Sequence, residues 1–335
     1  MRALAVVGLA FGVALLIGFG WVFHGPALLG ALALGFWPLA AAVAYRLPTL
    51  ALYAASWRLL IPPGGRPRFR TLLRLRWIGE SVNSLLPTAQ IGGDMVRAQL
   101  LAAQGVDGGA AAAAMIGDIA VGTLTQALFG MAGLLAFAED AGRGPVHSVA
   151  LGSVLLFAAA AVLLGLLHVG AGRLLARVPV VGRIGTRAKT LAGGIAATDA
   201  GMKALTRRQG ALVASAAWHL TGWLSHVGET WLVLALSGVR VSFPAALAIE
   251  SLSATARAAA FFVPGGLGVQ EAMVLYLCHR LGVPLEQALA LGLVKRFREI
   301  AVGVPGLIAW ALAERAPLNR RRARARAGLS ESCDV

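Results

Sequence analysis

Charged residues are scarce in this chain, and acidic residues are the scarcest. Asp, Glu, Lys and Arg together form 13% of the 335 residues, whereas hydrophobic residues form 58%. A soluble globular domain carries roughly 25% charged residues. Several apolar runs of the chain reach the ~20 residues that a bilayer-spanning helix needs. The composition therefore excludes an ordinary soluble domain and predicts an all-α polytopic membrane protein.

Cysteine is also scarce, which narrows the chemistry. The two cysteines, Cys278 and Cys333, are too few and too far apart for a disulfide framework or a cysteine-based metal site. His219, His226 and Glu229 have helical spacing, but no further close His or Cys completes a ligand set, so no metal is predicted. No Ser-His-Asp arrangement, phosphate-binding P-loop or dinucleotide motif is present, and no cofactor is predicted.

The net charge of +15 comes from basic residues that are grouped beside apolar runs. Because cytoplasmic loops of membrane proteins are rich in Lys and Arg, these groups predict cytoplasmic segments and two cytoplasmic termini. No aromatic residues alternate with the arginines, so nucleic-acid binding is not predicted. The high Arg-to-Lys ratio and the Ala content are typical of a GC-rich bacterial genome, and the expected location is a bacterial inner membrane. The basic groups lie at Arg58 to Arg76, Arg173 to Arg208 and Arg315 to Arg326.

The apolar runs predict one integral-membrane domain over 1–314 and a polybasic, disordered tail over 315–335. The first run is too long for a secretion signal and is expected to be a retained helix. Two apolar regions, 77–105 and 244–281, are broken by Pro and Gly. The charge rule allows each to be a re-entrant helical hairpin or a pair of full spans, and the buried polar groups favour hairpins. Full spans are expected near 3–23, 27–46, 109–137, 149–169, 211–237 and 286–313, with a basic cytoplasmic loop at 170–210.

The first broken region concentrates polar residues that cannot face hydrocarbon, so it is expected to line a cavity. Glu80 and Asn83 lie one helical turn apart on its first limb and share a face. Asp94 is expected to be a helix cap with Arg97 as its partner, or a headgroup or proton site. The free N–H groups of a helix that starts at the glycines would attract a phosphate. The candidate residues are Glu80, Asn83, Pro87, Gly92, Gly93, Asp94 and Arg97.

The second broken region repeats the elements of the first. A Glu-Ser pair, a Pro, two glycines and an acidic residue occur in the same order in both regions. If the regions enter from opposite faces, they form an inverted repeat, which is how many secondary transporters build their substrate sites. A carboxylate near a helix N-terminus is favourable whatever the function. The candidate residues here are Pro264, Gly265, Gly266, Gly268 and Glu271.

Charged residues also lie within two predicted full spans. Asp118 is well inside the span 109–137, where an unpaired carboxylate costs roughly 3 kcal/mol or more. Lys295, Arg298 and Glu299, with Arg296 beside them, lie in the last span and are candidate partners for Asp118, Glu271 or a lipid phosphate. Either a binding or gating site or a purely structural ion network would explain them.

Two motifs together resemble a known family. The segment from Gly79 to Arg97, with the pattern GES-N-LLP-x3-GGD-x2-R, and FFVPGGLGVQE at Phe261 to Glu271 are similar to the flippase-like membrane domain, also called the lysylphosphatidylglycerol synthase transmembrane region. The motif ESVNSLLP-x-AQ-x-GGD is most similar to the sequences of the hopanoid-biosynthesis-associated subgroup of this family. The resemblance covers most of residues 5–313 and implies that lipids, either a hopanoid or an anionic phospholipid, are the partners.

The resemblance implies movement of lipids between leaflets, and three hypotheses follow. Some members of the family carry a cytosolic aminoacyltransferase domain, and the tail after Trp310 is too short to fold one, so an enzyme is not the first expectation. The leading hypothesis is a lipid transporter gated by protonation of Asp94, Asp118 or Glu271. The alternatives are an integral-membrane enzyme that modifies a headgroup and a non-catalytic scaffold for other hopanoid-pathway proteins.

Overall fold

In the computed structural model, residues 36–86, 91–141, 154, 185–260, 266 and 268–331 are described, and every regular element among them is helical. The span expected at 3–23, that expected at 149–169 apart from residue 154, and Pro87, Pro264 and Gly265 lie outside these residues. The helices are α3 (Phe36–Leu60), the short 3-10 turn η1 (Pro63–Gly65), α4 (Phe69–Leu85), α5 (Gly92–Ala102), α6 (Gly108–Ala141), α9 (Gly185–Thr206), α10 (Gln209–Leu236), α11 (Phe243–Ala259), α12 (Val269–Arg280) and α13 (Leu285–Glu331).

Two of these helices, α3 and α6, are long and apolar enough to cross a membrane. The bounds of α6 and α10 agree closely with the spans expected at 109–137 and 211–237. The expected loop 170–210 contains α9, which packs on α6 at a close glycine contact. A Cβ atom on Gly109 would lie 2.4 Å from the carbonyl oxygen of Ala197, so only glycine allows this approach. The last helix, α13, continues past the expected end at residue 313.

The expected span 27–46 is wrong at its C-terminal end, because α3 continues to Leu60. Pro48 follows Arg46 closely, and a proline usually ends or kinks a helix because it lacks the N–H donor. The helix nevertheless runs through Pro48 and packs along α10. Membrane helices tolerate proline where neighbouring helices surround it. Arg46 therefore lies in the middle of a helix instead of at its end.

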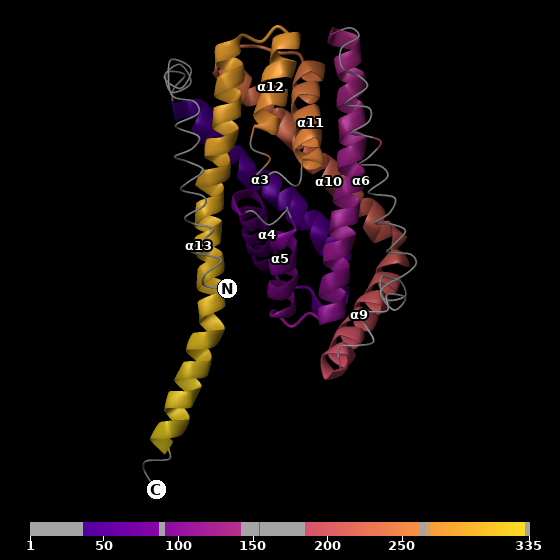
Figure 1. Ribbon diagram of the computed structural model, residues 1–335, viewed down its shortest axis with the longest axis vertical. Coiled ribbons are helices and arrows are strands. Elements are labelled where there is room, and N and C mark those ends of the chain that lie inside the picture. The colour runs from indigo at the N-terminus through magenta and orange to yellow at the C-terminus, as the bar shows by residue number, and fades with distance from the viewer. Residues whose placement is uncertain are drawn as a thin grey trace.

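Both broken regions are helical hairpins. The limbs α4 and α5 pack on each other, and so do α11 and α12. The limbs have 17, 11, 17 and 12 residues, fewer than the ~20 that a span needs. The two hairpins lie beside opposite ends of α6; the first connects to α6 at the lower end of that helix, and the second connects to α13 at the upper end of α13 (Figure 1). Both features favour the hairpin over the pair of full spans.

Apolar packing occupies two levels of the molecule. One cluster joins α6, α10, α11, α12 and α13 through residues such as Phe137, Leu234 and Leu252. Another joins α3, α4, α5, α6 and α9 around Trp57 and Leu72. On α3, Ala42 belongs to one cluster and Trp57 to the other, and the polar residues lie between them. The fold therefore places a polar layer between two apolar ones.

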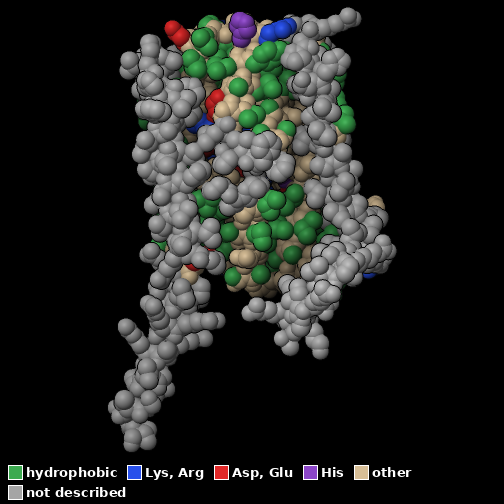
Figure 2. Space-filling view, in the orientation of Figure 1, with side chains coloured by type: hydrophobic (Ala, Val, Ile, Leu, Met, Phe, Trp, Pro, Cys, Tyr) green, Lys and Arg blue, Asp and Glu red, His purple; other side chains and the backbone are tan. Residues whose placement is uncertain are grey.

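The described outer surface is largely hydrophobic. Figure 2 shows hydrophobic side chains over most of the described part of one face, with charged groups in only a few places. Large apolar side chains such as Phe36, Trp37, Leu135, Val213 and Trp231 are exposed. A soluble protein rarely exposes so many large apolar groups together, and this surface suits contact with lipid.

Candidate functional site

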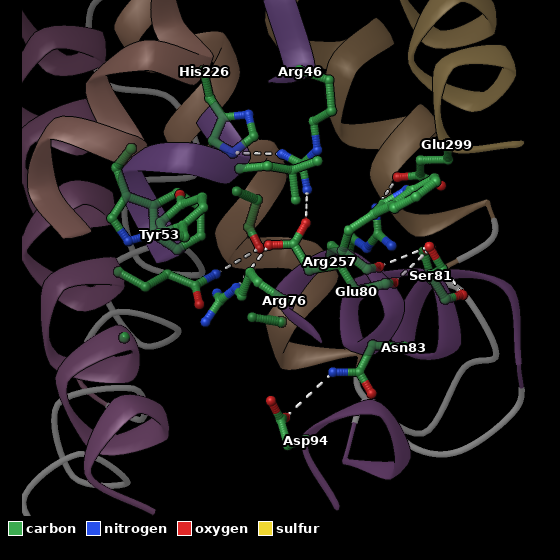
Figure 3. Close-up of a pocket in the computed structure, with 18 of the residues that line it drawn as sticks. Arg46, Tyr53, Arg76, Glu80, Ser81, Asn83, Asp94, His226, Arg257 and Glu299 are labelled. Atoms are coloured by element: carbon green, nitrogen blue, oxygen red, sulfur yellow. Dashed lines mark hydrogen bonds and ion pairs between the residues drawn. The ribbon is translucent and has the colours of Figure 1, made fainter. Parts of the chain in front are cut away.

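A cavity of about 360 Å³ lies in the polar layer. It is lined by both hairpins together with α3, α6, α10 and α13. This volume is within the range of small-ligand sites, ~300–1,000 Å³. Figure 3 shows side chains from several helices pointing toward one another around it. The charged and histidine residues that line it are Arg46, Arg76, Glu80, Asp94, Arg97, Asp118, His219, His226, Glu250, Arg257, Arg298 and Glu299.

Asp118 of α6 is fully surrounded by donors. Arg76 Nη1 donates to its Oδ2 over 2.5 Å, and Arg97 Nη2 lies 2.7 Å from the same atom. His219 Nε2 is 3.0 Å from Oδ1. Since Asp118 is only 2% exposed, its charge is stable there because three partners replace the lost water. Among the described residues α4, α5 and α10 supply these three groups, so the charges of the last span do not pair with Asp118. One of those charges, Arg296, contacts Glu271, the other acid expected from the sequence as a partner.

Glu80 of α4 links three helices. It accepts from Arg46 of α3 and from Arg76 Nε over 3.0 Å. Arg46 reaches between Glu80 and His226 of α10, and its Nη1 is 3.2 Å from His226 Nε2 (Figure 3). Because the guanidinium donates, this nitrogen of His226 is the acceptor. The pair of Arg46 and Glu80 thus joins the first hairpin to the helices packed against it.

The tip of the first hairpin is held by Asn83. Its Oδ1 accepts from the Gly93 N–H over 2.7 Å, and its Nδ2 donates to Asp94 over 3.3 Å. Asp94 also accepts from Arg97 Nη2 over 2.6 Å, which confirms the expected pairing. The expectation that Asp94 caps the helix is wrong: Ile91 is the N-cap residue, without a side-chain bond, and the carboxylate of Asp94 faces side chains instead.

Two glycines allow the limbs of this hairpin to touch. A Cβ atom on Gly93 would lie 1.9 Å from the carbonyl oxygen of Gly79 and 2.8 Å from Asn83 Cγ. Any larger residue at Gly93 would therefore push α5 away from α4. The close approach is what brings Asp94 and Arg97 to the same cavity as Glu80.

A second set of ion pairs connects α13 to α10 and to the second hairpin. Arg298 pairs with Glu229 of α10. Lys295 pairs with Glu250 of α11. Glu250 also accepts a hydrogen bond from the Thr230 hydroxyl. Arg296 pairs with Glu271 of α12, and its Nη1 donates to Glu299 over 2.8 Å. Arg257 of α11 pairs with Glu299 and donates to Gln270 over 3.0 Å.

Glu271 also holds the break of the second hairpin. Its Oε2 accepts from the Gly268 N–H over 2.8 Å, so its carboxylate closes the start of α12 as expected. Gly268 has φ of +80°, a conformation that favours glycine. Glu271 does not line the cavity, although it was expected to be part of the binding or gating site. Its observed contacts are those of a residue that supports the hairpin.

Every acid and base of this layer has a partner of opposite charge. Three acids and three bases form what we call the first cluster: Arg46, Arg76, Glu80, Asp94, Arg97 and Asp118. Four acids and four bases form what we call the second cluster: Glu229, Glu250, Arg257, Glu271, Lys295, Arg296, Arg298 and Glu299. Each cluster is therefore formally neutral.

Some buried polar atoms beside the cavity have no partner among the described residues. They are the hydroxyl of Tyr53, Nη1 of Arg97, Nδ1 of His219 and Nε1 of Trp223. All four residues line the cavity. Tyr53 lies at the centre of the group: its ring is 5.1 Å from that of His219 and 6.1 Å from that of Trp223, and the Arg76 guanidinium lies 5.1 Å above it. Buried unpaired polar atoms are costly and are typical of sites that a ligand or water completes.

The structure unites most of the residues expected from the sequence and adds others. Glu80, Asn83, Asp94, Arg97, Asp118, Arg298 and Glu299 line one cavity. Lys295 lies just behind it, in contact with Glu250. Arg76 was expected among cytoplasmic charges, which is wrong, because it is inside the cavity, and its position four residues before Glu80 was the available signal. The residues missed as site members are Arg46, Tyr53, His219, His226, Glu250, Arg257 and Gln270.

The donor set does not suggest a metal centre. Among residues 36–86, 91–141 and the later described segments, no three of His, Cys, Asp and Glu are grouped as metal ligands. The carboxylates instead bind arginines and a lysine. The chemistry of the layer is thus ion pairing and hydrogen bonding.

The family comparison agrees with this architecture. Residues 4–306 match the sequence model of the lysylphosphatidylglycerol synthase TM region. The chain belongs to this family. Its membership, with the helical fold and apolar surface, makes it a helical membrane protein related to lipid modification or transport. No curated protein and no solved structure is significantly similar to the chain.

Proposed function

We propose that the protein is a lipid transporter of the bacterial inner membrane. In this proposal a polar headgroup occupies the cavity while the hydrophobic part of the lipid, acyl chains or a hopanoid skeleton, stays in the bilayer. The observation that carries the proposal is the cavity itself, lined by paired charges and enclosed by two hairpins from opposite ends of the molecule.

The physical reason is the cost of moving a headgroup through hydrocarbon. A charged side chain at the bilayer centre costs roughly 3 kcal/mol or more without partners, and a phosphate faces the same difficulty. The cavity offers charges of both signs and unpaired donors. Broken helices that meet near the middle of a protein form substrate sites in many transporters, and the two hairpins fit that pattern.

The orientation follows from the basic segments. We propose that both termini are cytoplasmic and that the first hairpin enters from the cytoplasmic side, because Arg58, Arg68, Arg70 and Arg74 precede or begin α4. The second hairpin then enters from the opposite side. Each hairpin would give the cavity access to one leaflet, as alternating access requires.

The test is lipid movement by purified protein in vesicles. Fluorescent phospholipid in the inner leaflet is protected from a membrane-impermeant quencher, so the rate of loss of protection measures transport. We expect Asp94→Asn to lower this rate at least about tenfold while the protein stays folded, because Asp94 lines the cavity and organises its tip. Asp107→Asn is the matched control, since Asp107 is exposed and only caps α6 at Ala110 N–H. Equal rates for wild type and Asp94→Asn would overturn the proposal.

A headgroup-modifying enzyme is the second candidate. The contact of His219 with Asp118 beside the cavity favours it, because a histidine held by a carboxylate is a common general base. Deletion of the gene discriminates the two. A missing lipid species would indicate an enzyme, whereas an unchanged inventory with lipid retained in the inner membrane would support transport. A scaffold would tolerate loss of all the cavity charges.

A further inference from the structure

The charge balance of the cavity limits the net charge of what it binds. Among the described residues, the first and second clusters each contain equal numbers of acids and bases, all of them paired. A ligand with a net charge would leave that charge uncompensated in a buried layer. An uncompensated buried charge is strongly unfavourable, whereas a zwitterion adds charges of both signs and keeps the balance.

Within the layer, one ion pair is best placed to receive such a ligand. The side chains of Arg46 and Glu80 are 17% and 22% exposed, and both line the cavity. Each also has another partner, because Arg46 contacts His226 and Glu80 contacts Arg76. If the pair separates, neither side chain is left without a contact. In the second cluster, by contrast, Lys295 and Arg298 have no second partner among the described residues and are deeply buried.

The unpaired donors indicate where the negative end of the ligand would lie. Trp223 Nε1–H and Arg97 Nη1–H are donors only and Tyr53 O–H can donate, so acceptors satisfy all three, and phosphate oxygens are strong acceptors. The ring of Tyr53 is 6.0 Å from that of His226, which contacts Arg46. The ring of Trp223 is also 5.8 Å from that of His226, so two of the three donors belong to side chains close to Arg46, and Glu80 remains for a cation.

We propose that the ligand is a zwitterionic lipid headgroup, an ammonium-bearing phosphate diester that separates the Arg46–Glu80 pair and takes over one partner from each. The phosphate binds Arg46 and the unpaired donors, and the ammonium binds Glu80. The proposal rests on the function proposed above, for which it names the substrate class. It makes net charge the feature by which lipids are selected.

The experiment measures binding and not transport, so the two proposals can fail separately. Full-length protein in a non-ionic detergent is titrated with short-chain phosphatidylethanolamine, which is zwitterionic, phosphatidylglycerol, which is anionic, and a diacyl trimethylammonium lipid, which is cationic. We expect the wild type to bind phosphatidylethanolamine at least about tenfold more tightly than either of the others, given the penalty for an unbalanced buried charge. Inorganic phosphate and phosphoethanolamine, added as competitors, separate a free anion from a lipid headgroup.

Variants that remove one charge from the cavity should shift the lipid preference in a direction that the sign of the lost charge predicts. Glu80→Gln leaves the cavity with one excess positive charge, so the preference should move about tenfold toward phosphatidylglycerol. Arg46→Gln should move it by a similar factor toward the cationic lipid. The double variant is neutral again and should lose affinity without either shift. Arg74→Gln, on the exposed face of α4, and Glu286→Gln, exposed at the start of α13, change net charge outside the cavity and should leave the preference unchanged.

Several results would overturn the proposal. Tightest binding of the anionic or cationic lipid by the wild type would do so, as would identical preferences in Glu80→Gln and Arg46→Gln. Displacement of the lipid by inorganic phosphate alone would make the site one for a free anion. If the zwitterion binds as expected but vesicles show no transport, the transport function fails while the binding site stands.

Discussion

The two charged clusters differ in how their partners are shared. In the first cluster the acids are shared: Asp118 contacts Arg76, Arg97 and His219, and Glu80 contacts Arg46 and Arg76. The second cluster includes two pairs, which we call simple pairs, whose base has no other partner among the described residues: Arg298 with Glu229, and Lys295 with Glu250. The acids have further neighbours, since His226 lies 3.8 Å from Glu229 and Thr230 donates to Glu250. Sharing means that a base which loses one acid still has another contact. The first cluster can therefore exchange partners, and these two pairs cannot.

Burial separates three residues of the first cluster from the two simple pairs, although Asp118 and Arg97 of that cluster are buried as deeply as those pairs. Glu80, Arg46 and Asp94 have side-chain exposures of 22%, 17% and 15%, whereas Glu229 and Lys295 are at 2% and 5%. Partly exposed, shared charges suit a site where a ligand binds and leaves. Deeply buried pairs suit a joint that fixes α13 to α10 and α11. Ion pairs of the same polar layer can therefore have different roles, ligand binding or helix packing, and substitution of single residues tests this difference.

The largest effect is expected from breaking a simple pair. Glu229→Gln leaves Arg298 buried without its carboxylate, so the free energy of unfolding should fall by about 3–5 kcal/mol. Asp118→Asn should cost less than half of this, because Arg76 retains Glu80 and Arg97 retains Asp94. Thermal unfolding in detergent measures both.

A compensating variant guards against a trivial loss of folding. Glu229→Gln combined with Arg298→Met removes both charges and should recover most of the lost stability. If Asp118→Asn proves as costly as Glu229→Gln, sharing does not protect the first cluster, and the distinction between the clusters is wrong.

The next effect concerns the packing of the first hairpin. Gly93→Ala places a methyl group against the Gly79 carbonyl oxygen, so we expect a loss of about 1–3 kcal/mol and a displaced α5. Gly210→Ala is the matched control, because no atom lies near its added methyl group and alanine favours a helix. The unfolding midpoint should fall in the first variant and stay level or rise in the second. A harmless Gly93→Ala would mean that the limbs do not need their contact.

A smaller effect separates the two hairpin acids. Glu271→Gln removes a charge from the Gly268 N–H and from Arg296, but Arg296 retains Glu299. We expect a loss of about 1–2 kcal/mol of stability, close to that of a lost cap, with transport per folded molecule unchanged. Asp94→Asn should show the reverse, with transport lost and stability nearly kept. If the Glu271→Gln variant is fully stable but does not transport lipid, Glu271 is part of the functional site after all.

Parts of the fold and site could be predicted because local sequence determines them. The Gly and Pro breaks identified both hairpins, since proline and paired glycines interrupt helices whatever surrounds them. The pairing of Asp94 with Arg97 followed from a three-residue spacing on one helix. The acid within an apolar run also marked Asp118 as a buried group that needs partners.

The remaining site residues could not be predicted because they come from distant helices. Arg46 and His226 are 180 positions apart, and no local pattern indicates that α3 and α10 lie side by side. The span expected at 27–46 ends before α3 does, so Arg46 was placed at a helix end and Tyr53 outside the span, although both lie within α3. Arg76 was assigned to the solvent by the basic residues before it, although the turn of α4 directs it inward to Asp118.

The smallest expected effect on stability has the opposite sign from the others. Tyr53→Phe deletes a buried hydroxyl that has no partner among the described residues and keeps the ring that contacts His219 and Arg76. Because an unpaired buried hydroxyl is unfavourable, stability should be unchanged or should rise by up to about 1 kcal/mol. Affinity for phosphatidylethanolamine should nevertheless fall several-fold, since one phosphate contact is lost. Removal of a hydroxyl raises the stability of the protein and lowers its affinity for the lipid only if that hydroxyl is unpaired in the free protein and bonds to the ligand. A fall in stability with unchanged affinity would instead show that the Tyr53 hydroxyl supports the fold and not the ligand.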